Sequence, residues 1–445
     1  MQSKFNLKEY NDRLEALFSR FQSVQKIGFK DGAYKPGLQG MKRFDSVLGS
    51  PWKQYPCIHV AGTNGKGSVC SMLAAALASG GDATFASQPR RVGLYTSPHL
   101  LDFRERMKVT GPSGFEMISR EQVWEFLEEY ETSFEGLSFF EITTGMAFWW
   151  FARQGVGAAV IETGLGGRLD STNIITPVLS VVTSIGLDHC ALLGSTRAEI
   201  AAEKAGIFKP GVPAVVGVRD PETAPVFEKA AADAGAPLVF ASDEPAFEIE
   251  PSLLAEMDLR GPCQDVNLHT VLVALDTLSD LRQNPAGMPQ LQAICHAGER
   301  TGLWGRWQTV CREPEVICDI GHNPPALKEN FRRLKAMQEK GRDLIIVYGI
   351  MADKDLDGIA PMMPGNALYI LAAPANERSL PAEDLKRRLE ALRPDIDSRT
   401  ASGVAAAAQQ ALDLAQDLPN PLIYIGGSTF VVAEALPLFN KTAEL

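Results

Sequence analysis

The segment HVAGTNGKGSV (residues 59–69) has the residue types and spacing of a phosphate-binding loop. A buried apolar strand ends at Ala61, a glycine-rich stretch follows, and an alanine-rich helix begins at once. Glycines let backbone N–H groups converge on phosphate oxygens, and a helix N-terminus adds partial positive charge. Lys66 supplies a mobile cation for the β- and γ-phosphates. The pattern predicts a nucleotide site made by Gly62, Thr63, Asn64, Gly65, Lys66, Gly67 and Ser68.

This loop differs from the common G-x-x-x-x-G-K-[ST] motif. One residue fewer separates its outer glycines, and Gly67 stands between the lysine and the serine. The alternative interpretation is a glycine-rich turn between a strand and a helix, with a solvated lysine. A nucleotide loop by itself names no reaction, because kinases, transport ATPases, GTPases and ligases all use one.

Polar side chains also follow three other predicted strands, at the edge where open α/β sheets bind ligands. Ser97 comes directly after one strand, Glu162 ends the next, and Asp188 and His189 lie just past a third. A buried carboxylate is costly unless a cation neutralises it, and Mg²⁺ prefers oxygen ligands. The shared position of these residues therefore predicts a metal site.

Each of these residues also has a structural interpretation. Ser97 is a candidate helix cap, Glu162 a candidate ion-pair partner of Arg168, and His189 a candidate turn histidine. Lys204, in AAEKAGIFKPG at the end of a predicted helix, is interpreted from the residues alone as a surface lysine.

Alternating strands and helices must position these residues. The first series has strands at residues 57–62, 92–97, 158–163, 178–186 and 213–218, with helices at 9–21, 68–79, 120–130, 141–153 and 196–208. Continuous apolar strands that alternate with helices predict a doubly wound, mostly parallel sheet buried on both faces.

A second series begins near residue 300 and predicts a smaller, Rossmann-like α/β domain. Its strands are residues 315–321, 343–351, 367–374 and 421–428, and its helices are 326–340, 382–392 and 403–416. The proline- and glycine-containing stretch 284–306 separates the two series. We therefore predict domains at residues 1–297 and 298–445, with the active site in a cleft between them.

Composition excludes several classes of protein. The 445 residues are 45% hydrophobic and 22% charged, as in a globular protein, and no apolar run reaches the ~18 residues of a membrane span. The 43 Lys and Arg against 54 Asp and Glu give a net charge of −11 with no basic run, which argues against nucleic-acid binding. The N-terminal residues mix charges and the seven cysteines form no C-x-x-C, which predicts a cytoplasmic protein with reduced thiols.

The segments GTNGKGS, YTSPHL, ETGLGGRLDSTN, GLDH with EKAGIFK, GHNP and DKD occur in this order. From about residue 10 to its end, the chain resembles the folylpolyglutamate synthase/dihydrofolate synthase family of the Mur ligase superfamily. The resemblance implies a P-loop-containing central domain of Mur ligase type, followed by a C-terminal ligase domain. It also implies an ATP- and Mg²⁺-dependent ligase that activates a folate or pteroate carboxylate as an acyl phosphate. The amino group of L-glutamate would then attack to form an amide, releasing ADP and phosphate.

The same resemblance assigns roles to single residues of the first domain. Ser97 and Glu162 would bind one Mg²⁺, and His189 would bind a second. Lys204 matches a family lysine that is often carbamylated. Carbamylation would turn this cation into an anionic metal ligand. The resemblance therefore replaces the interpretation of Lys204 as a surface lysine. Asn267 matches a residue that contacts adenine.

In the C-terminal half, Arg306 matches an arginine that reaches the ATP phosphates. Asp319 and His322 match residues of the nucleotide and catalytic site, where one of them would orient or deprotonate the amine. Lys354 and Ser428 are candidate glutamate-side residues, with an exposed turn lysine and a helix cap as the alternatives.

The implied substrates are dihydropteroate, tetrahydrofolate and L-glutamate, with ATP, two Mg²⁺ ions and a monovalent cation as cofactors. We expect a monomer with no nucleic-acid or membrane partner. Three other functions remain open: a Mur-type amide ligase acting on another carboxylic acid, a P-loop ATPase without ligase activity, and a small-molecule kinase.

Overall fold

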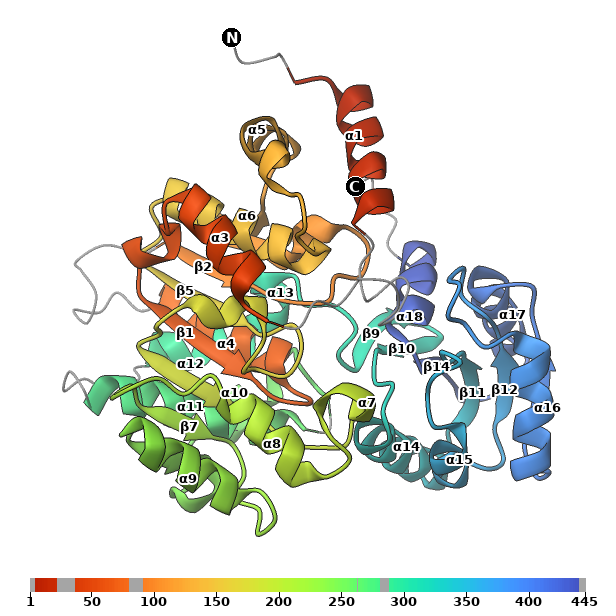
Figure 1. Ribbon diagram of the computed structural model, residues 1–445. Helices are drawn as coiled ribbons and strands as arrows, with labels where there is room; N and C mark the ends of the chain where they lie inside the picture. The colour runs from red at the N-terminus through yellow and green to blue at the C-terminus, as the bar shows by residue number, and fades with distance from the viewer. Residues whose placement is uncertain (1–4, 22–36, 80–90, 262, 281–287, 440–445) are drawn as a thin grey trace. The chain divides into compact units, whose positions relative to one another are not determined.

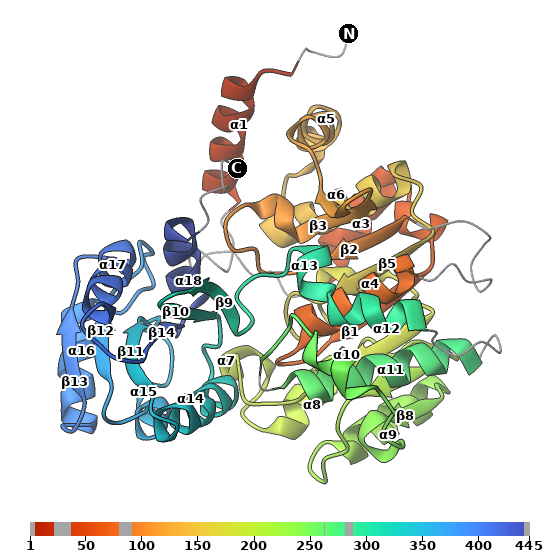
Figure 2. The same cartoon turned by 180° about the vertical axis from the view of Figure 1, so that it is seen from behind.

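The structure is a computed structural model that describes residues 5–21, 37–79, 91–261, 263–280 and 288–439 (Figures 1 and 2). The chain forms two compact units. The first comprises Met1–His99, Phe103–Asp258 and Asp265–Leu303, and the second Leu100–Asp102, Leu259–Gln264 and Trp304–Leu445. The predicted domain boundary between residues 297 and 298 stays a prediction, and residues 284–287 of the stretch that suggested it lie outside the described residues.

An eight-stranded sheet in the order β4-β3-β2-β5-β1-β6-β7-β8 forms the centre of the first unit. From β2 to β8 all neighbours are parallel, whereas β3 pairs antiparallel with both β2 and β4. The strands are β1 (Cys57–Ala61), β2 (Val92–Tyr95), β3 (Met107–Gly111), β4 (Gly114–Met117), β5 (Ala158–Glu162), β6 (Leu179–Val182), β7 (Ala214–Val216) and β8 (Leu238–Phe240). This confirms the predicted doubly wound, mostly parallel sheet.

Helices cover both faces of this sheet. The chain crosses from β1 to β2 through α4 and returns from β2 to β5 through α6, and right-handed crossovers in opposite directions place these two helices on opposite faces. The α-helices of the first unit are α1 (Leu7–Arg20), α3 (Gln39–Leu48), α4 (Lys66–Ser79), α5 (Arg120–Tyr130), α6 (Phe139–Arg153), α7 (Cys190–Leu193), α8 (Arg197–Ala205), α9 (Ala224–Ala234), α10 (Pro251–Ala255), α11 (Gln264–Asp280), α12 (Met288–Cys295) and α13 (Ala297–Thr301).

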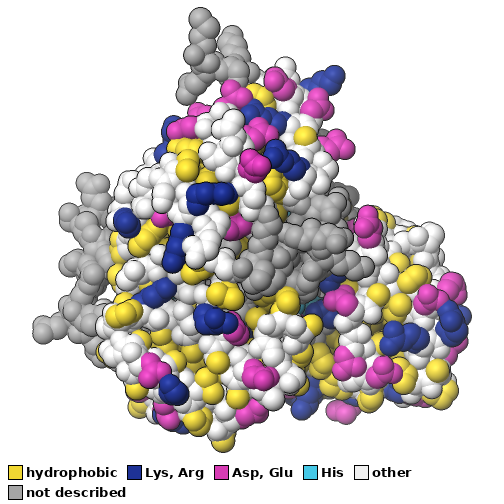
Figure 3. Space-filling model, viewed as in Figure 1, with side chains coloured by type: hydrophobic (Ala, Val, Ile, Leu, Met, Phe, Trp, Pro, Cys, Tyr) yellow, Lys and Arg dark blue, Asp and Glu magenta, His cyan; other side chains and the backbone are white. Residues whose placement is uncertain are grey.

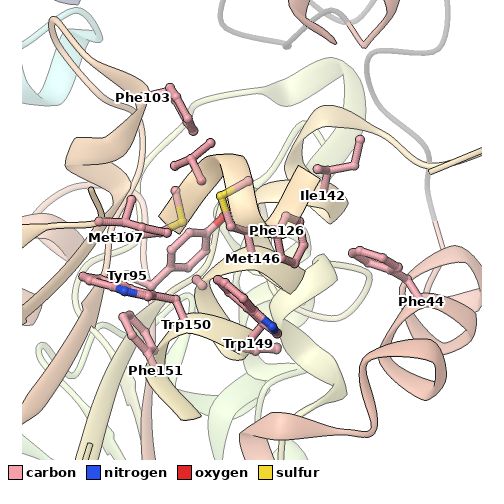
Figure 4. Packing of buried hydrophobic residues seen from close by; sticks show 14 of the residues in the cluster. Phe44, Tyr95, Phe103, Met107, Phe126, Ile142, Met146, Trp149, Trp150 and Phe151 are labelled. Atoms are coloured by element: carbon pink, nitrogen blue, oxygen red, sulfur yellow. The ribbon is translucent and has the colours of Figure 1, made fainter. Parts of the chain in front are cut away.

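Aromatic side chains fill the core between α6 and the sheet (Figure 4). Tyr95, fully buried at the end of β2, has its hydroxyl 3.1 Å from the hydroxyls of both Thr143 and Thr144 on α6. Ser138 begins α6 with a capping box, in which its hydroxyl accepts the N–H of Glu141 and the Glu141 carboxylate accepts the N–H of Ser138. This packing fixes the end of β2, two residues before Ser97.

The second unit has a six-stranded sheet in the order β13-β12-β11-β14-β10-β9, parallel except for the edge strand β9. The strands are β9 (Gln308–Arg312), β10 (Glu315–Asp319), β11 (Asp343–Tyr348), β12 (Leu368–Leu371), β13 (Asp397–Thr400) and β14 (Pro421–Gly426), with helices α14 (Pro324–Glu339), α15 (Leu356–Ile359), α16 (Ala382–Leu392), α17 (Val404–Ala415) and α18 (Thr429–Ala435). The predicted Rossmann-like α/β fold is confirmed.

The main errors of the sequence prediction concern short strands. The sequence does not predict the β3–β4 hairpin, because residues 107–117 mix glycine and polar residues and β4 is not buried. It does not predict strands β8, β9 and β13 either. The strand predicted over residues 178–186 ends at Val182, since the next residues turn towards the glycine-rich loop.

Two further observations concern the whole described chain. No helix in the described ranges is long and apolar enough to cross a membrane. All seven cysteines are free thiols, and four of them are buried.

Candidate active site

The loop between β1 and α4 has a shape that only glycine allows at two positions. Gly62 has φ +149° and Gly65 has φ +88°, backbone conformations that residues with a side chain rarely adopt. A Cβ atom at Gly62 would overlap the hydroxyl of Thr183, and one at Gly65 would overlap Oδ1 of Asn267. Asn267, the predicted adenine contact at the start of α11, therefore lies directly against the loop.

The segment that follows β6 holds this loop in place. The N–H of Thr63 donates to the carbonyl of Ser184 at 2.7 Å. The carbonyl of Asn64 accepts the hydroxyls of Thr183 at 2.6 Å and Ser184 at 3.0 Å. The Thr63 hydroxyl bonds both the N–H and the carbonyl of Gly186 at 3.1 Å. The phosphate-loop conformation is thus built into the protein by contacts to a neighbouring strand end.

Two lysine side chains meet at one backbone carbonyl of the loop. Nζ of Lys66 donates to Gly62 O at 3.0 Å, and Nζ of Lys204 donates to the same oxygen at 2.9 Å. Lys204 is 4% exposed, so its interpretation as a surface lysine is wrong. Burial, together with the charge of Lys66, lowers the pKa of Lys204 to about 7 against the opposing influence of Asp188. Two amino groups therefore lie beside the loop, and Lys204 loses its proton more readily than an ordinary lysine.

Glu162 and Ser97 lie together at the ends of β5 and β2. The Glu162 side chain is 2% exposed, and its carboxylate accepts the backbone N–H of Ser97 at 3.1 Å. Arg168 forms an ion pair with Glu203 at 2.7 Å, and its pairing with Glu162 stays a prediction. The next helical turn after Ser97 begins only at Phe103, which excludes Ser97 as its cap.

His189 occupies a tight turn before α7. Its φ is +53°, its N–H donates to Oδ1 of Asp188 at 2.9 Å, and its Nε2 lies 3.8 Å from Oδ2 of that residue. This arrangement agrees with the turn-histidine interpretation, and metal binding by His189 stays a prediction. Within the described ranges, no group of three or more His, Cys, Asp or Glu side chains is placed to hold a metal ion.

In the second unit, Asp319 joins two loops. Its carboxylate, 7% exposed at the end of β10, accepts the N–H groups of Trp307 and Gly321 at 2.8 Å each and the amide of Asn330 at 2.5 Å. Burial raises the pKa of Asp319, although these donors and Arg306 oppose that shift. Asp319 thus fixes the backbone next to Arg306.

The remaining predicted residues of the second unit lie on loops and a helix start. Nδ1 of His322 lies 3.1 Å from the carbonyl of Ile320, on the same loop as Gly321. Ser428 caps α18 by accepting the N–H of Phe430 at 3.2 Å, as its alternative interpretation proposed. Lys354 is half-buried in the turn after β11.

Sequence reasoning missed the residues that support the site. Thr183 and Ser184 shape the phosphate loop, Asn330 holds Asp319, and Asn173 contacts the backbone near Lys204. The Thr-Ser pair directly after an apolar strand is a sequence signal for this role, because it occupies the same sheet edge as the other polar residues.

Comparison with known proteins identifies the family. A model described as "Mur ligase, glutamate ligase domain" matches residues 305–429. The chain is 32% identical over 453 residues to a probable bifunctional folylpolyglutamate synthase/dihydropteroate synthase of Haloferax volcanii, covering 96% of this chain but only 50% of that protein. It is 36% identical over 302 residues to the dihydrofolate synthase/folylpolyglutamate synthase of Escherichia coli, covering 67% of this chain and 68% of that protein. The chain belongs to the folylpolyglutamate synthase/dihydrofolate synthase family.

Solved structures of this family share the fold. E. coli FolC in complex with DHPP and ADP matches with a TM-score of 0.78 and 28% identity, covering 96% of this chain and 97% of that one. A bifunctional folylpolyglutamate synthase/dihydrofolate synthase with Mn, AMPPNP and L-glutamate bound matches with a TM-score of 0.76, 28% identity and the same coverage.

Proposed function

We propose that the chain is an ATP-dependent ligase that adds L-glutamate to dihydropteroate, to (poly)glutamyl tetrahydrofolate, or to both. One observation carries the proposal. The glycine-rich loop after β1 brings two lysine side chains to a single backbone carbonyl, and a buried carboxylate, Glu162, lies at the end of β5, the strand that pairs directly with β1. Family membership supports this reading of the loop as a nucleotide site.

The chemistry requires the concentrated positive charge. A substrate carboxylate attacks the γ-phosphorus of ATP, the bond to the β-phosphate oxygen breaks, and ADP leaves as an acyl phosphate forms. The glutamate amine then attacks the acyl carbon, loses a proton, and displaces phosphate. The first step brings two anions together, so the metal ions, Lys66, the loop N–H groups and Arg306 must offset their repulsion.

Glu162 and Ser97 fit the first Mg²⁺. A carboxylate that is 2% exposed, with a serine beside it, offers the oxygen donors that a hard divalent cation prefers. We propose that His189 contributes to a second ion. The metals would supply charge neutralisation on the phosphates, and Mn in the AMPPNP complex of a relative supports the use of divalent ions. The monovalent cation rests on the resemblance alone.

Carbamylation of Lys204 agrees with its surroundings. Addition of CO₂ to the amine forms an N–C bond and releases a proton, and only the neutral amine reacts. Burial beside a second cation, Lys66, favours the neutral form, with a pKa of about 7 for Lys204. The carbamate would be an anion next to Lys66 and an oxygen donor for a metal.

The nucleotide and amine contacts are further parts of the proposal. Asn267, packed against Gly65, would contact the nucleotide, and Arg306 its phosphates. Asp319 would act by holding the loops that carry Arg306 and His322. We propose His322 as the residue that orients the glutamate amine.

A single assay series tests the function. Purified protein receives ATP, Mg²⁺ and L-glutamate with dihydropteroate or tetrahydrofolate, and the products are measured by mass spectrometry. We expect an amide product together with glutamate-dependent release of ADP. ATP hydrolysis without amide would identify an ATPase, and a stable phosphorylated acceptor would identify a kinase. Absence of amide with both acceptors contradicts the proposal.

A further inference from the structure

We propose that Asn173 is a positioning residue for Lys204. Its side-chain amide joins two segments. The first, residues 163–173, directly follows Glu162 and is called here the Glu162 loop. The second, residues 203–207, is called here the Lys204 turn. The inference rests on the proposed function, because it treats Lys204 as part of the phosphate and metal site. Its structural basis is a set of contacts that can be tested without any enzymatic assay.

The Glu162 loop and the Lys204 turn meet backbone to backbone. The N–H of Arg168 donates to the carbonyl of Glu203 at 2.7 Å. A Cβ atom on Gly167 would lie 2.7 Å from that same oxygen and 2.9 Å from the carbonyl of Lys204, and one on Gly206 would overlap Arg168. The two glycines therefore allow an approach that any side chain would prevent.

Asn173 joins the two segments from within. It is 5% exposed, and its Nδ2 donates to Arg168 O at 3.0 Å in the loop and to Gly206 O at 2.9 Å in the turn. The backbone carbonyl of Asn173 accepts a hydrogen bond from Nζ of Lys209 at 2.9 Å, just beyond the turn. One buried amide thus satisfies a carbonyl on each side of the contact, and its removal leaves both without that donor.

The two hydrogen bonds from the Asn173 amide are called here the clamp. The Glu162 loop is itself anchored, so the clamp can hold the Lys204 turn in a defined position. The Asp170 carboxylate accepts the N–H groups of Leu165 at 2.7 Å and Thr172 at 3.0 Å, which closes the loop. The Thr172 hydroxyl lies 2.5 Å from Asp170 Oδ1 and 2.8 Å from Nε2 of His59, a buried residue of β1. The loop is therefore fixed to the strand that leads into the phosphate loop.

The clamp consequently fixes the position of the Lys204 backbone, from which the side chain extends. Lys204 reaches from the end of α8 to Gly62 O, whereas segment 183–186 holds the phosphate loop independently. The ion pair between Arg168 and Glu203 cannot replace the clamp, since the Arg168 side chain is 56% exposed and such pairs contribute little. Loss of Asn173 should therefore impair the step that uses Lys204 more than it impairs nucleotide binding.

The test compares three variants of the full-length chain with wild type. Asn173→Ala removes the amide. Asn173→Asp keeps its size but places a carboxylate oxygen against two carbonyls. Gly206→Ala pushes the segments apart from the other side, at a φ of −61° that alanine adopts freely. Asn420→Ala is the matched control, because this exposed amide also donates to a backbone carbonyl, that of Gly341 at 2.9 Å, in the second unit.

Two measurements decide the outcome. Hydrogen exchange read by mass spectrometry should become about tenfold faster or more in residues 164–173 and 200–208 of all three variants and stay unchanged in the control. The kcat should fall about tenfold while KM for ATP changes less than about twofold, as expected when one buried hydrogen-bonding group is lost. Gly206→Ala keeps the test usable if an Asn173 variant does not fold.

Unchanged exchange in the folded variants overturns the proposal, and so does a rise in KM for ATP equal to the fall in kcat. Asn173→Asp with wild-type kcat overturns it as well, since that substitution removes the donor. Failure of the proposed function is distinguishable, because in that case wild type itself forms no amide while the exchange comparison still tests the clamp.

Discussion

The hydroxyl of Thr183 should contribute measurably to nucleotide affinity. Its Oγ1 donates to Asn64 O at 2.6 Å, and the Ser184 hydroxyl donates to the same oxygen at 3.0 Å. Thr183→Val removes one of two donors and leaves the carbonyl partly satisfied, a loss of about 1 kcal/mol. In this variant the phosphate loop is free to relax when no nucleotide is bound, and it must return to its native shape to bind one. The lost free energy should therefore appear as a roughly fivefold weaker affinity for the nucleotide.

The double variant Thr183→Val/Ser184→Ala removes both donors. Leaving a carbonyl without its donors costs roughly 1–3 kcal/mol, and partial access of water to Asn64 favours the lower end of that range. We expect ADP binding to weaken about tenfold. Calorimetric titration with ADP measures this directly, and KM for ATP checks it under turnover.

Two further variants make this experiment specific. Thr183→Ser keeps the hydroxyl and should bind ADP like wild type. Thr277→Val is the same substitution at a hydroxyl that donates to Val273 O at 2.8 Å within α11, so it should leave ADP affinity unchanged. If Thr183→Val binds ADP as tightly as wild type, or if Thr277→Val weakens binding equally, segment 183–186 does not shape the loop.

Three further predictions follow from single residues. Glu162→Ala should abolish glutamate-dependent ADP release without unfolding the protein, and near-normal release from the purified variant would show the metal assignment to be wrong. Lys66→Ala should weaken ADP binding severely in the calorimetric titration, while the circular dichroism spectrum stays unchanged. Lys108 is 6% exposed and donates to the carbonyls of Thr301 at 2.6 Å and Gly302 at 3.0 Å, and burial lowers its pKa from 10.5 to about 8. Because the unfolded chain keeps the proton between pH 8 and 10.5, folding stability should rise with pH across that window, by roughly 3 kcal/mol from this group. Urea unfolding at pH 8 and pH 10 should show this rise in wild type and in Lys229→Met, whose side chain is 77% exposed, but not in Lys108→Met.

The conformation of the glycine-rich loop and the strand-end position of Glu162 could be predicted because their signals are local, whereas their roles stay predictions. A buried strand, a glycine-rich turn and a helix start occur within a dozen residues, and the strand-end position of Glu162 follows from the apolar run before it. Parallel strands bring such ends to one edge of the sheet. The structure places Glu162 and Ser97 together there, as their positions implied.

The environment of Lys204 could not be predicted from its neighbours in the sequence. The segment AAEKAGIFKPG is typical of an exposed helix end, and the lysine is buried by a carbonyl 142 residues away and by the Glu162 loop. The β3–β4 hairpin gave no signal for a related reason. Its pairing is set by the edge of β2 rather than by an apolar pattern of its own.

The net charge of −11 describes the whole chain but not the phosphate loop, where two lysine side chains meet. On the face drawn in Figure 3, basic and acidic side chains are interspersed rather than separated by sign. Two lysine side chains, Lys66 and Lys204, meet instead at Gly62 O, where burial and then the charge of Lys66 lower the pKa of Lys204. A phosphate bound by the loop would relieve that repulsion, and a carbamate on Lys204 would reverse the sign of one partner. On the proposed function, ligand binding and the chemical state of Lys204 would be linked: an anion at the loop would favour the ammonium, whereas a metal ion beside Glu162 would favour the neutral or carbamylated side chain.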